Sequence, residues 1–395
     1  MIVMIFIALA CSFSVTLLTL PSSSLHEVSI TSVPELIAAA LLAGLPAHYG
    51  LTTAWIICLV TSAVGGIRGL ISGVTPSLAI ILVSLVQTSG VGYAIYAALF
   101  ASLFQMAVGV LKIGEFIRFI PYPVMVGFLT GTALLIVLSQ LTFFQEPTVL
   151  VQGQSRPFYN LSYQMNAFTA FTGGSWVTPS SAIVMIIEAL MTLIISIALP
   201  RFTKVIPSIL VALIVVTGIG EWAIARSLGF SGTLVGELAT INTPSWPMIF
   251  FFDKSIEIPP LNMDTFLKIW PTGIAIFFIS QVQNILALKH IRSVNRDNES
   301  DVNLVSLSQG VGQFISSMCG GMAGSVMISQ SVILHECGGV NNLSVFSAGI
   351  LIFGVCAGAY TALSIVPIGF IIGINVFAVS FFLTYPSCLV LKRKR

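Results

Sequence analysis

Charged residues are scarce in this sequence. Asp, Glu, Lys and Arg together make up 8% of its 395 residues, whereas soluble globular domains contain about 25%. Hydrophobic residues make up 56% of the chain. This balance is typical of an integral membrane protein, so we expect the lipid bilayer to surround much of the chain. The net charge of +2 does not indicate nucleic-acid binding.

The sequence also lacks the motifs of several enzyme and cofactor classes. Its six cysteines include no C-x-x-C pair, and its four histidines show no spacing typical of metal ligands. No stretch resembles a nucleotide-binding motif, and no nucleophile–base pair is visible. We therefore predict that the protein is not an enzyme, binds no metal or cofactor, and does not use ATP directly.

Two glycine-rich stretches, 65–80 and 320–334, share an unusual pattern. Each runs from glycines through small hydroxyl residues into a short apolar run. In the first stretch, Pro76 suits the opening turn of a helix, and Thr75 and Ser77 are typical capping residues. The pattern predicts helices that begin partway through the membrane. Their N-termini would carry a partial positive charge that suits an anion.

Paired interrupted segments in the two halves of a membrane protein are typical of transporter binding sites. The alternative is that these glycines only allow helices to pack closely. We favour the binding-site interpretation because both stretches have the same order of residue types.

About twelve apolar segments follow an apolar N-terminal stretch. Residues 1–27 are compatible with an extra span, an uncleaved anchor or an unusual start, and the sequence does not decide among these. Polar stretches at 145–180 and 221–265 are expected to be loops outside the bilayer. The predicted membrane segments are 28–45, 50–64, 75–88, 91–111, 122–143, 180–199, 205–220, 266–288, 303–318, 325–335, 344–361 and 364–384.

Several short motifs, in this order and spacing, resemble the SulP sulfate-permease family of anion transporters. The resemblance covers roughly residues 28–385. Each motif is weak alone, and their order makes the resemblance specific. The motifs are Pro34-Glu35, Ala43-Gly44-Leu45-Pro46, Tyr49-Gly50-Leu51, Gly65-Gly66, Arg68-Gly69, Ser72-Gly73, 111–114, 118–121, 123–128, 199–207, Gln309-Gly310, Gly320-Gly321 and 365–367.

The resemblance implies an all-α polytopic fold of the uracil-permease type, which is an inverted repeat of seven plus seven helices. It implies a core domain at about 28–111 and 266–361, and a gate domain at about 122–220 and 364–385. Together they would form a SulP-type transmembrane domain over residues 28–395. The anion would lie between the tips of the third and tenth helices, which are the two interrupted helices described above.

The sequence departs from the family pattern in places. The family usually continues with two more spans and a cytoplasmic STAS domain, so we expect a chain truncated to about 12 membrane segments and lacking that domain. Gln283-Asn284-Ile285-Leu286 stands where the family often has Glu-Ser-Leu-Leu. Gln330 stands where many members have Arg. The predicted anion site therefore relies on neutral donors.

An acid inside a span is costly and indicates a functional site. We predict that Glu35 carries a coupling proton, the alternative being an acid that faces a water-filled vestibule. Gln283 can donate to an anion or to a neighbouring helix, and the serines can contact substrate, cap helices or pack. Glu188 is interpreted as a packing or interfacial acid. The predicted substrate-binding residues are Glu35, Thr75, Ser77, Gln283, Ser325, Ser329 and Gln330.

The leading hypothesis is secondary active transport of a small inorganic or carboxylate anion by alternating access across the inner or plasma membrane. Protons are the candidate coupling ion, and a homodimer is the candidate assembly. Sulfate is the default substrate from the family's name, with bicarbonate, chloride and dicarboxylates open. The alternatives are a transport-incompetent or channel-like subunit, and a nucleobase permease of the same fold. Gln283 and Gln330 argue against the permease, which is expected to keep an acid in both spans.

The distribution of basic residues predicts the orientation of the chain. If residue 28 enters from the cytoplasm and each segment crosses once, every Lys and Arg except Arg156, Arg226, Lys254 and Lys268 falls inside. We therefore expect the C-terminal tail, Lys392-Arg393-Lys394-Arg395, to be cytoplasmic. A reporter enzyme fused after the tail should be active only in the cytoplasm, and activity confined to the outer side would contradict this orientation.

Overall fold

The computed structural model describes residues 23–65, 69–113, 178–202, 208–218, 258–260, 262–295, 301–336 and 341–358, with parts of 127–144 and 367–376. Residues 1–22 of the expected N-terminal stretch, the motif residue Arg68 and the basic tail lie outside the described residues, whereas residues 23–27 belong to the first described helix.

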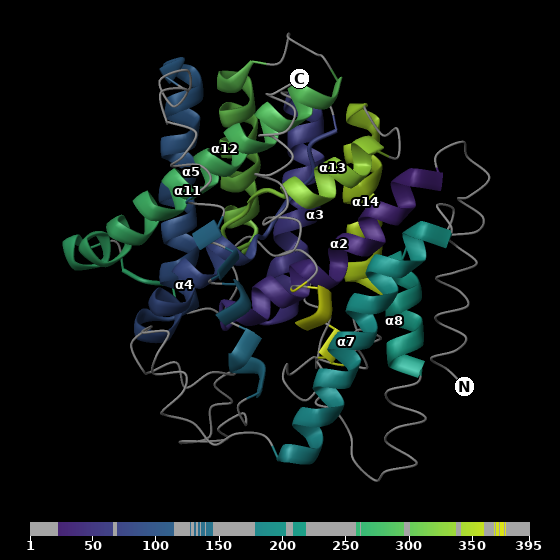
Figure 1. Ribbon diagram of the computed structural model, residues 1–395. Coiled ribbons are helices and arrows are strands. Elements are labelled where there is room, and N and C mark those ends of the chain that lie inside the picture. The colour runs from purple at the N-terminus through teal and green to yellow at the C-terminus, as the bar shows by residue number, and fades with distance from the viewer. Residues whose placement is uncertain are drawn as a thin grey trace. The chain divides into compact units, whose positions relative to one another are not determined.

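The described part of the chain is almost entirely helical (Figure 1). Its two strands have two residues each: β1 (Ser72–Gly73) and β2 (Ser325–Val326). Its helices are α2 (Ser23–Leu42), α3 (Ala47–Val64), α4 (Pro76–Ser89), α5 (Val91–Val110), the 3-10 helix η2 (Leu141–Phe144), α7 (Pro179–Phe202), α8 (Ser208–Gly218), α11 (Met263–Asn295), α12 (Val302–Met318), α13 (Ile328–Glu336) and α14 (Asn342–Gly358).

Four of the described helices contain a stretch that is long and apolar enough to cross a membrane: Ala47–Val64, Val91–Val110, Pro179–Leu199 and Met263–Lys289. Each has the length of about 20 residues that a bilayer core requires. Three shorter apolar helices, Ser32–Leu42, Pro76–Ser89 and Asn342–Cys356, accompany them. This mixture of full and short apolar helices agrees with the sequence pattern.

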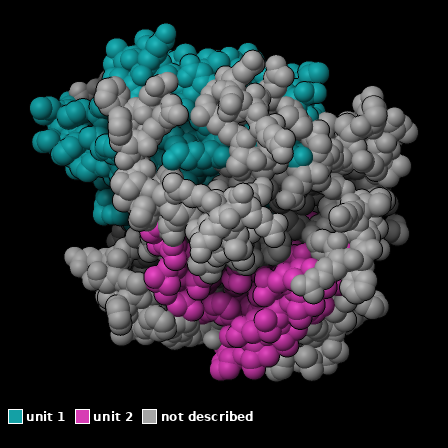
Figure 2. Space-filling model, turned by 45° about the horizontal axis from the view of Figure 1, so that its top comes forward, with its two compact units in different colours: residues 1–121, 242–362 teal, residues 122–241, 363–395 magenta. Residues whose placement is uncertain are grey.

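The chain divides into two compact units, and each unit contains residues from both halves of the sequence (Figure 2). Unit 1 consists of Met1–Pro121 and Asn242–Ala362, and unit 2 consists of Tyr122–Ile241 and Leu363–Arg395. The functional division into a core and a gate stays a prediction.

In unit 1, α12 packs against α5 and α3. Two glycines permit the close approach of α5 and α12. A Cβ added to Gly310 of α12 would lie 2.7 Å from the backbone nitrogen of Met106, and one added to Gly109 of α5 would lie 2.6 Å from Leu307 Cβ. Small residues of this kind let helix backbones approach each other inside a membrane.

In unit 2, the described helices α7 and α8 pack on each other. Glu188 of α7 is fully buried, and a Cβ added to Gly369 would lie 2.6 Å from Glu188 Cβ. A Cβ added to Gly373 would likewise lie 2.6 Å from Thr192 Cβ. These two glycines let the chain approach α7 closely. The interpretation of Glu188 as a packing residue stays a prediction.

We predict that Gly310→Ala lowers the thermal unfolding midpoint of the detergent-solubilised protein, because its methyl group overlaps the backbone of α5. The expected loss is about 1–3 kcal/mol, the usual cost of overpacking. Gly354→Ala is the matched control, since Gly354 is an exposed helical glycine with no atom within 4 Å of an added Cβ. An equal loss in both variants would contradict this account of the packing.

Candidate functional site

The two short strands pair with each other although they are far apart in sequence. β1 and β2 run antiparallel, with Ser72 opposite Val326 and Gly73 opposite Ser325. The backbone N–H of Met327 extends the pairing by donating to the oxygen of Ile71 at 2.9 Å. The sequence did not predict this ladder, because two residues are too few to show the alternating pattern of a strand.

A short helix follows each strand. α4 begins at Pro76, with Thr75 as its N-cap residue, and α13 begins at Ile328. They contain 14 and 9 residues, too few to cross a bilayer. The two interrupted helices expected from the sequence are therefore present in the structure, and their N-termini begin beside the same ladder.

The expectation that Thr75 caps α4 with its side chain is wrong. Thr75 is the N-cap residue, but its side chain makes no capping hydrogen bond. Its hydroxyl group instead donates to Gln283 Oε1 of α11 at 3.3 Å. The hydroxyl group of Thr75 bonds to a neighbouring helix in place of the local capping bond to the backbone of α4.

Four of the predicted site residues form one hydrogen-bonded cluster. Gln283 Oε1 accepts from the hydroxyl groups of Thr75 and Ser325, and Gln283 Nε2 donates to Ser77 Oγ at 3.0 Å. Thr75 Oγ1 also lies 3.4 Å from Ser325 Oγ. All four side chains are buried. We call these four residues the Gln283 cluster.

The Gln283 cluster joins three elements that are distant in sequence. Thr75 and Ser77 stand at the start of α4, Ser325 lies in β2, and Gln283 lies in the middle of α11. The cluster therefore lies where the N-terminus of α4 meets the strand that leads into α13. Hydroxyl and amide groups can both donate and accept hydrogen bonds, and a helix N-terminus attracts negative charge. The arrangement can bind a small anion with polar groups.

Glu35 and Gln330 form a separate pair. Gln330 Nε2, in the first turn of α13, donates to Glu35 Oε2 of α2 at 3.0 Å. Both side chains are buried. The sequence named each residue as a site candidate but did not predict that they pair, since they are 295 positions apart.

Ser329 is buried in the first turn of α13, next to Gln330. Among the described residues it takes no part in the hydrogen bonds of the Gln283 cluster. The structure thus gathers four predicted residues in one cluster and two in a neighbouring pair, and leaves Ser329 close to the pair in sequence. Their role in binding a substrate stays a prediction.

Sequence reasoning assigned no role to several polar residues that hold the ladder. Gln309 Nε2 donates to Ser72 Oγ, and the Cys58 thiol donates to the oxygen of Ser72 at 3.1 Å. The backbone N–H of Met322 donates to Thr53 Oγ1 at 2.8 Å. Their signal in the sequence is a buried polar residue inside an apolar helix, which in a membrane protein usually has a partner.

No group of three or more His, Cys, Asp or Glu side chains that could hold a metal ion occurs within the described ranges.

The chain matches known proteins over most of its length. The profile of the Sulfate permease family matches residues 27–391. "Putative sulfate transporter YbaR" of Bacillus subtilis (strain 168) is 32% identical over 322 residues, which cover 82% of this chain and 58% of YbaR. Bicarbonate transporter BicA of Synechocystis sp. is 24% identical over 338 residues, covering 82% of this chain and 54% of BicA. The chain therefore spans little more than half the length of these relatives.

Solved structures show the same fold. The transmembrane domain of a cyanobacterial bicarbonate transporter BicA superposes with a TM-score of 0.73 at 23% identity, covering 93% of this chain and 89% of that domain. The murine anion transporter Slc26a9 in its inward-facing state gives a TM-score of 0.68 at 16% identity, covering 94% of this chain and 62% of that protein. The likeness confirms the expected all-α fold with its inverted seven-plus-seven repeat.

Proposed function

The chain belongs to the sulfate permease family, whose members are membrane anion transporters and not enzymes, and on this premise we propose that it is a secondary transporter of a small anion. The observation that carries the proposal is the Gln283 cluster. It lies at the start of one interrupted helix and beside the strand that leads into the other. Transporters commonly direct the N-termini of interrupted helices at anionic substrate groups.

The charge of the site favours a monovalent anion. The Gln283 cluster consists of neutral side chains only. Each helix N-terminus carries the equivalent of about half a positive charge. The N-termini of α4 and α13 together therefore offset about one negative charge, and a divalent anion would leave a second charge without compensation in a low-dielectric site.

An anion that keeps a proton fits the cluster better than one that does not. Gln283 Oε1 accepts two hydrogen bonds, so the cluster contains an acceptor beside its donors. A hydrogencarbonate ion can donate its O–H to this oxygen while its other oxygens accept from Thr75 and Ser325. Sulfate at neutral pH has no proton to donate, which would leave a buried acceptor unpaired at a cost of about 1–3 kcal/mol. We therefore favour a bicarbonate-like monoanion over sulfate, the default from the family's name.

The Glu35–Gln330 pair offers a route for proton coupling. Gln330 belongs to the first turn of α13, so its bond to Glu35 links the carboxyl group of α2 to one of the interrupted helices. α2 packs against α3, α4, α13 and α14. The titratable groups among their described side chains are His48, Tyr49 and Cys58 of α3, His335 of α13 and Cys356 of α14. We propose that Glu35 gains a proton when the anion binds and loses it on release.

Transport by alternating access, a cytoplasmic C-terminus and a homodimeric assembly belong to the same proposal.

The substrate assignment is tested by calorimetric binding of hydrogencarbonate, chloride and sulfate to the purified full chain at mildly alkaline pH. We expect hydrogencarbonate to bind at least about tenfold more tightly than sulfate, a difference of about 1.4 kcal/mol. Gln283→Leu should raise the Kd for the bound anion by about tenfold, since the donor and the acceptor of the cluster are both lost.

Gln281→Leu is the matched control for Gln283→Leu. Gln281 lies on the same helix, is equally buried, and donates to Ser306 Oγ of α12, outside the Gln283 cluster. We expect Gln281→Leu to leave anion affinity within about threefold of the parent, against the tenfold loss expected for Gln283→Leu. Tighter binding of sulfate than of hydrogencarbonate would overturn the substrate class, and equal losses in the two variants would overturn the site.

Proton coupling is tested with Glu35→Gln. Uptake of the anion by the parent protein, reconstituted into proteoliposomes, should rise as the pH falls. Protonation of Glu35 removes a negative charge near the proposed anion site. The glutamine amide keeps an acceptor for Gln330 but cannot titrate. We therefore expect uptake by Glu35→Gln to be independent of pH while anion binding remains measurable. A variant with the same pH dependence as the parent would show that another group carries the proton.

A further inference from the structure

Two glutamines of α12 contact the two extended segments that lead into the interrupted helices. Gln309 Nε2 donates to Ser72 Oγ of β1. One helical turn later, Gln313 Nε2 donates to the oxygen of Met322 at 3.1 Å, and Gln313 Oε1 accepts from the backbone N–H of Gly324 at 2.6 Å. Residues 322–324 lie directly before β2. One face of α12 thus contacts both β1 and the segment before β2.

α12 is itself fixed in place by close packing against neighbouring helices. It packs against α5 and α3, and Gly310, between the two glutamines, lies against the backbone of α5. Gln309 and Gln313 are 2% and 1% exposed. Neither residue belongs to the Gln283 cluster, so neither has a role in the proposed contact with the anion.

We propose that Gln309 and Gln313 are positioning residues that hold β1 and the segment before β2 where α4 and α13 present their N-termini to the anion. This role rests on the proposed function, since it matters for transport only if an anion binds at those N-termini. We call the two residues the α12 glutamine pair.

The chemistry of the amide group explains why glutamine stands at position 313. Residues 321–324, directly before β2, belong to neither a helix nor a strand, so the oxygen of Met322 and the N–H of Gly324 have no helical partners. A carboxamide supplies a donor and an acceptor from one neutral side chain, whereas a charged side chain would be costly at this buried position. Thr53 of α3 completes the support, accepting from the N–H of Met322 at 2.8 Å and donating to the oxygen of Tyr49 at 2.7 Å.

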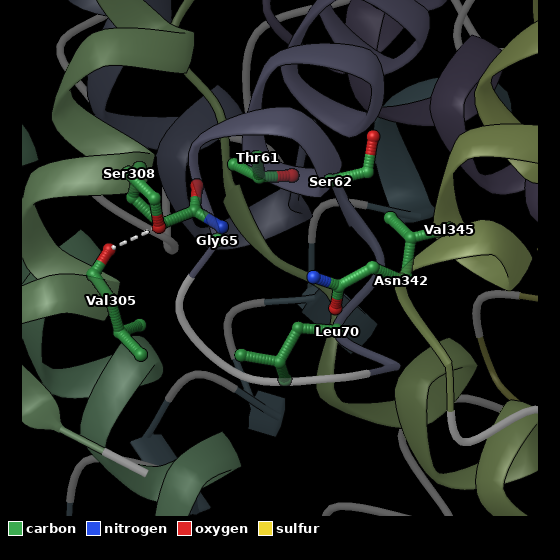
Figure 3. A pocket seen from close by; sticks show the side chains of 9 residues that line it. Thr61, Ser62, Gly65, Leu70, Val305, Ser308, Asn342 and Val345 are labelled. Carbon is green, nitrogen blue, oxygen red and sulfur yellow. Dashed lines mark hydrogen bonds between the residues drawn. The ribbon is translucent and has the colours of Figure 1, made fainter.

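Gln309 differs from Gln313 because only its Nε2 group makes a hydrogen bond to the described part of the protein. Its Oε1 is buried and has no hydrogen-bond partner within the described ranges. Gln309 also lines a cavity of about 10 Å³ between α3, α12 and α14, and Figure 3 shows Thr61, Ser308 and Asn342 around it. A polar cavity of this size can hold one water molecule. We therefore expect the loss of Gln313 to affect the ladder more than the loss of Gln309.

Hydrogen exchange followed by mass spectrometry tests this role directly on the full chain in detergent. In Gln313→Leu, the amides of residues 321–327 should exchange at least tenfold faster than in the parent. In Gln309→Leu, the faster exchange should centre on residues 69–75 and be smaller. Gln313→Glu retains an oxygen that accepts from Gly324, so its exchange at Gly324 should stay closer to that of the parent.

Gln105→Leu is the matched control. Gln105 is 2% exposed and its Nε2 donates to Ser280 Oγ of α11 at 2.6 Å, so Gln105→Leu loses a buried side-chain bond of the same kind but leaves the bonds of Gln309 and Gln313 in place. Exchange at 69–75 and 321–327 should match the parent in this variant. The Kd for the anion should rise about tenfold in Gln313→Leu and stay within about threefold of the parent in Gln105→Leu.

The outcomes separate the positioning role from the proposed function. If the parent binds an anion but exchange at 321–327 is the same in the parent and in Gln313→Leu, or changes equally in Gln105→Leu, the positioning role is wrong. If exchange changes as expected but the parent binds none of hydrogencarbonate, chloride or sulfate, the proposed function is wrong and the α12 glutamine pair still holds the ladder.

Discussion

A non-helical segment that leads into a helix inside a membrane has backbone N–H and C=O groups that neither a helical turn nor bulk water can satisfy. In this protein the extended segments before α4 and α13 meet that requirement by pairing with each other as β1 and β2. The pairing continues past the strands, since the N–H of Met327 donates to the oxygen of Ile71 and the N–H of Ile71 donates to Ser331 Oγ at 3.0 Å. The candidate site depends on this ladder because it fixes where both interrupted helices begin.

Neutral polar side chains make hydrogen bonds to backbone groups that the ladder leaves unpaired. Thr53 of α3, Gln283 of α11 and Gln309 of α12 contact the ladder or the segment beside it. They satisfy backbone groups without placing a full charge in a low-dielectric region, where charge is costly. Glu35 is the exception among the site residues, and the amide of Gln330 is its partner. A site of this composition can compensate an anion mainly through helix dipoles, which leaves the ion free to depart.

The sequence predicted the interrupted helices well because their signals are local. Glycines, hydroxyl residues and Pro76 in a fixed order indicate the start of a helix whatever the rest of the chain does. The ladder and the Glu35–Gln330 pair join residues hundreds of positions apart, and no local pattern carries that information. Gln313 contacts Met322 and Gly324, 9 and 11 positions away, but these bonds need the turn after α12, which no helical or strand pattern predicts. The side-chain cap assigned to Thr75 failed for the same reason, since its hydroxyl has a partner on α11 that only the tertiary fold supplies. The order of residue types thus located the two interrupted helices, but not the hydrogen bonds around them.

The bonds within the Gln283 cluster constrain how an anion can bind there. Thr75 and Ser325 have one O–H donor each, and both donors are already directed at Gln283 Oε1. An anion must therefore exchange these bonds for its own, and each exchange gains only the small net energy of a hydrogen bond made at the expense of another. Gln283 Oε1 then loses its donors unless the ligand brings one, which favours an anion that keeps a proton. Binding by exchange is weaker than binding to unpaired donors, and moderate affinity at a central site is what release on the opposite side of a membrane requires.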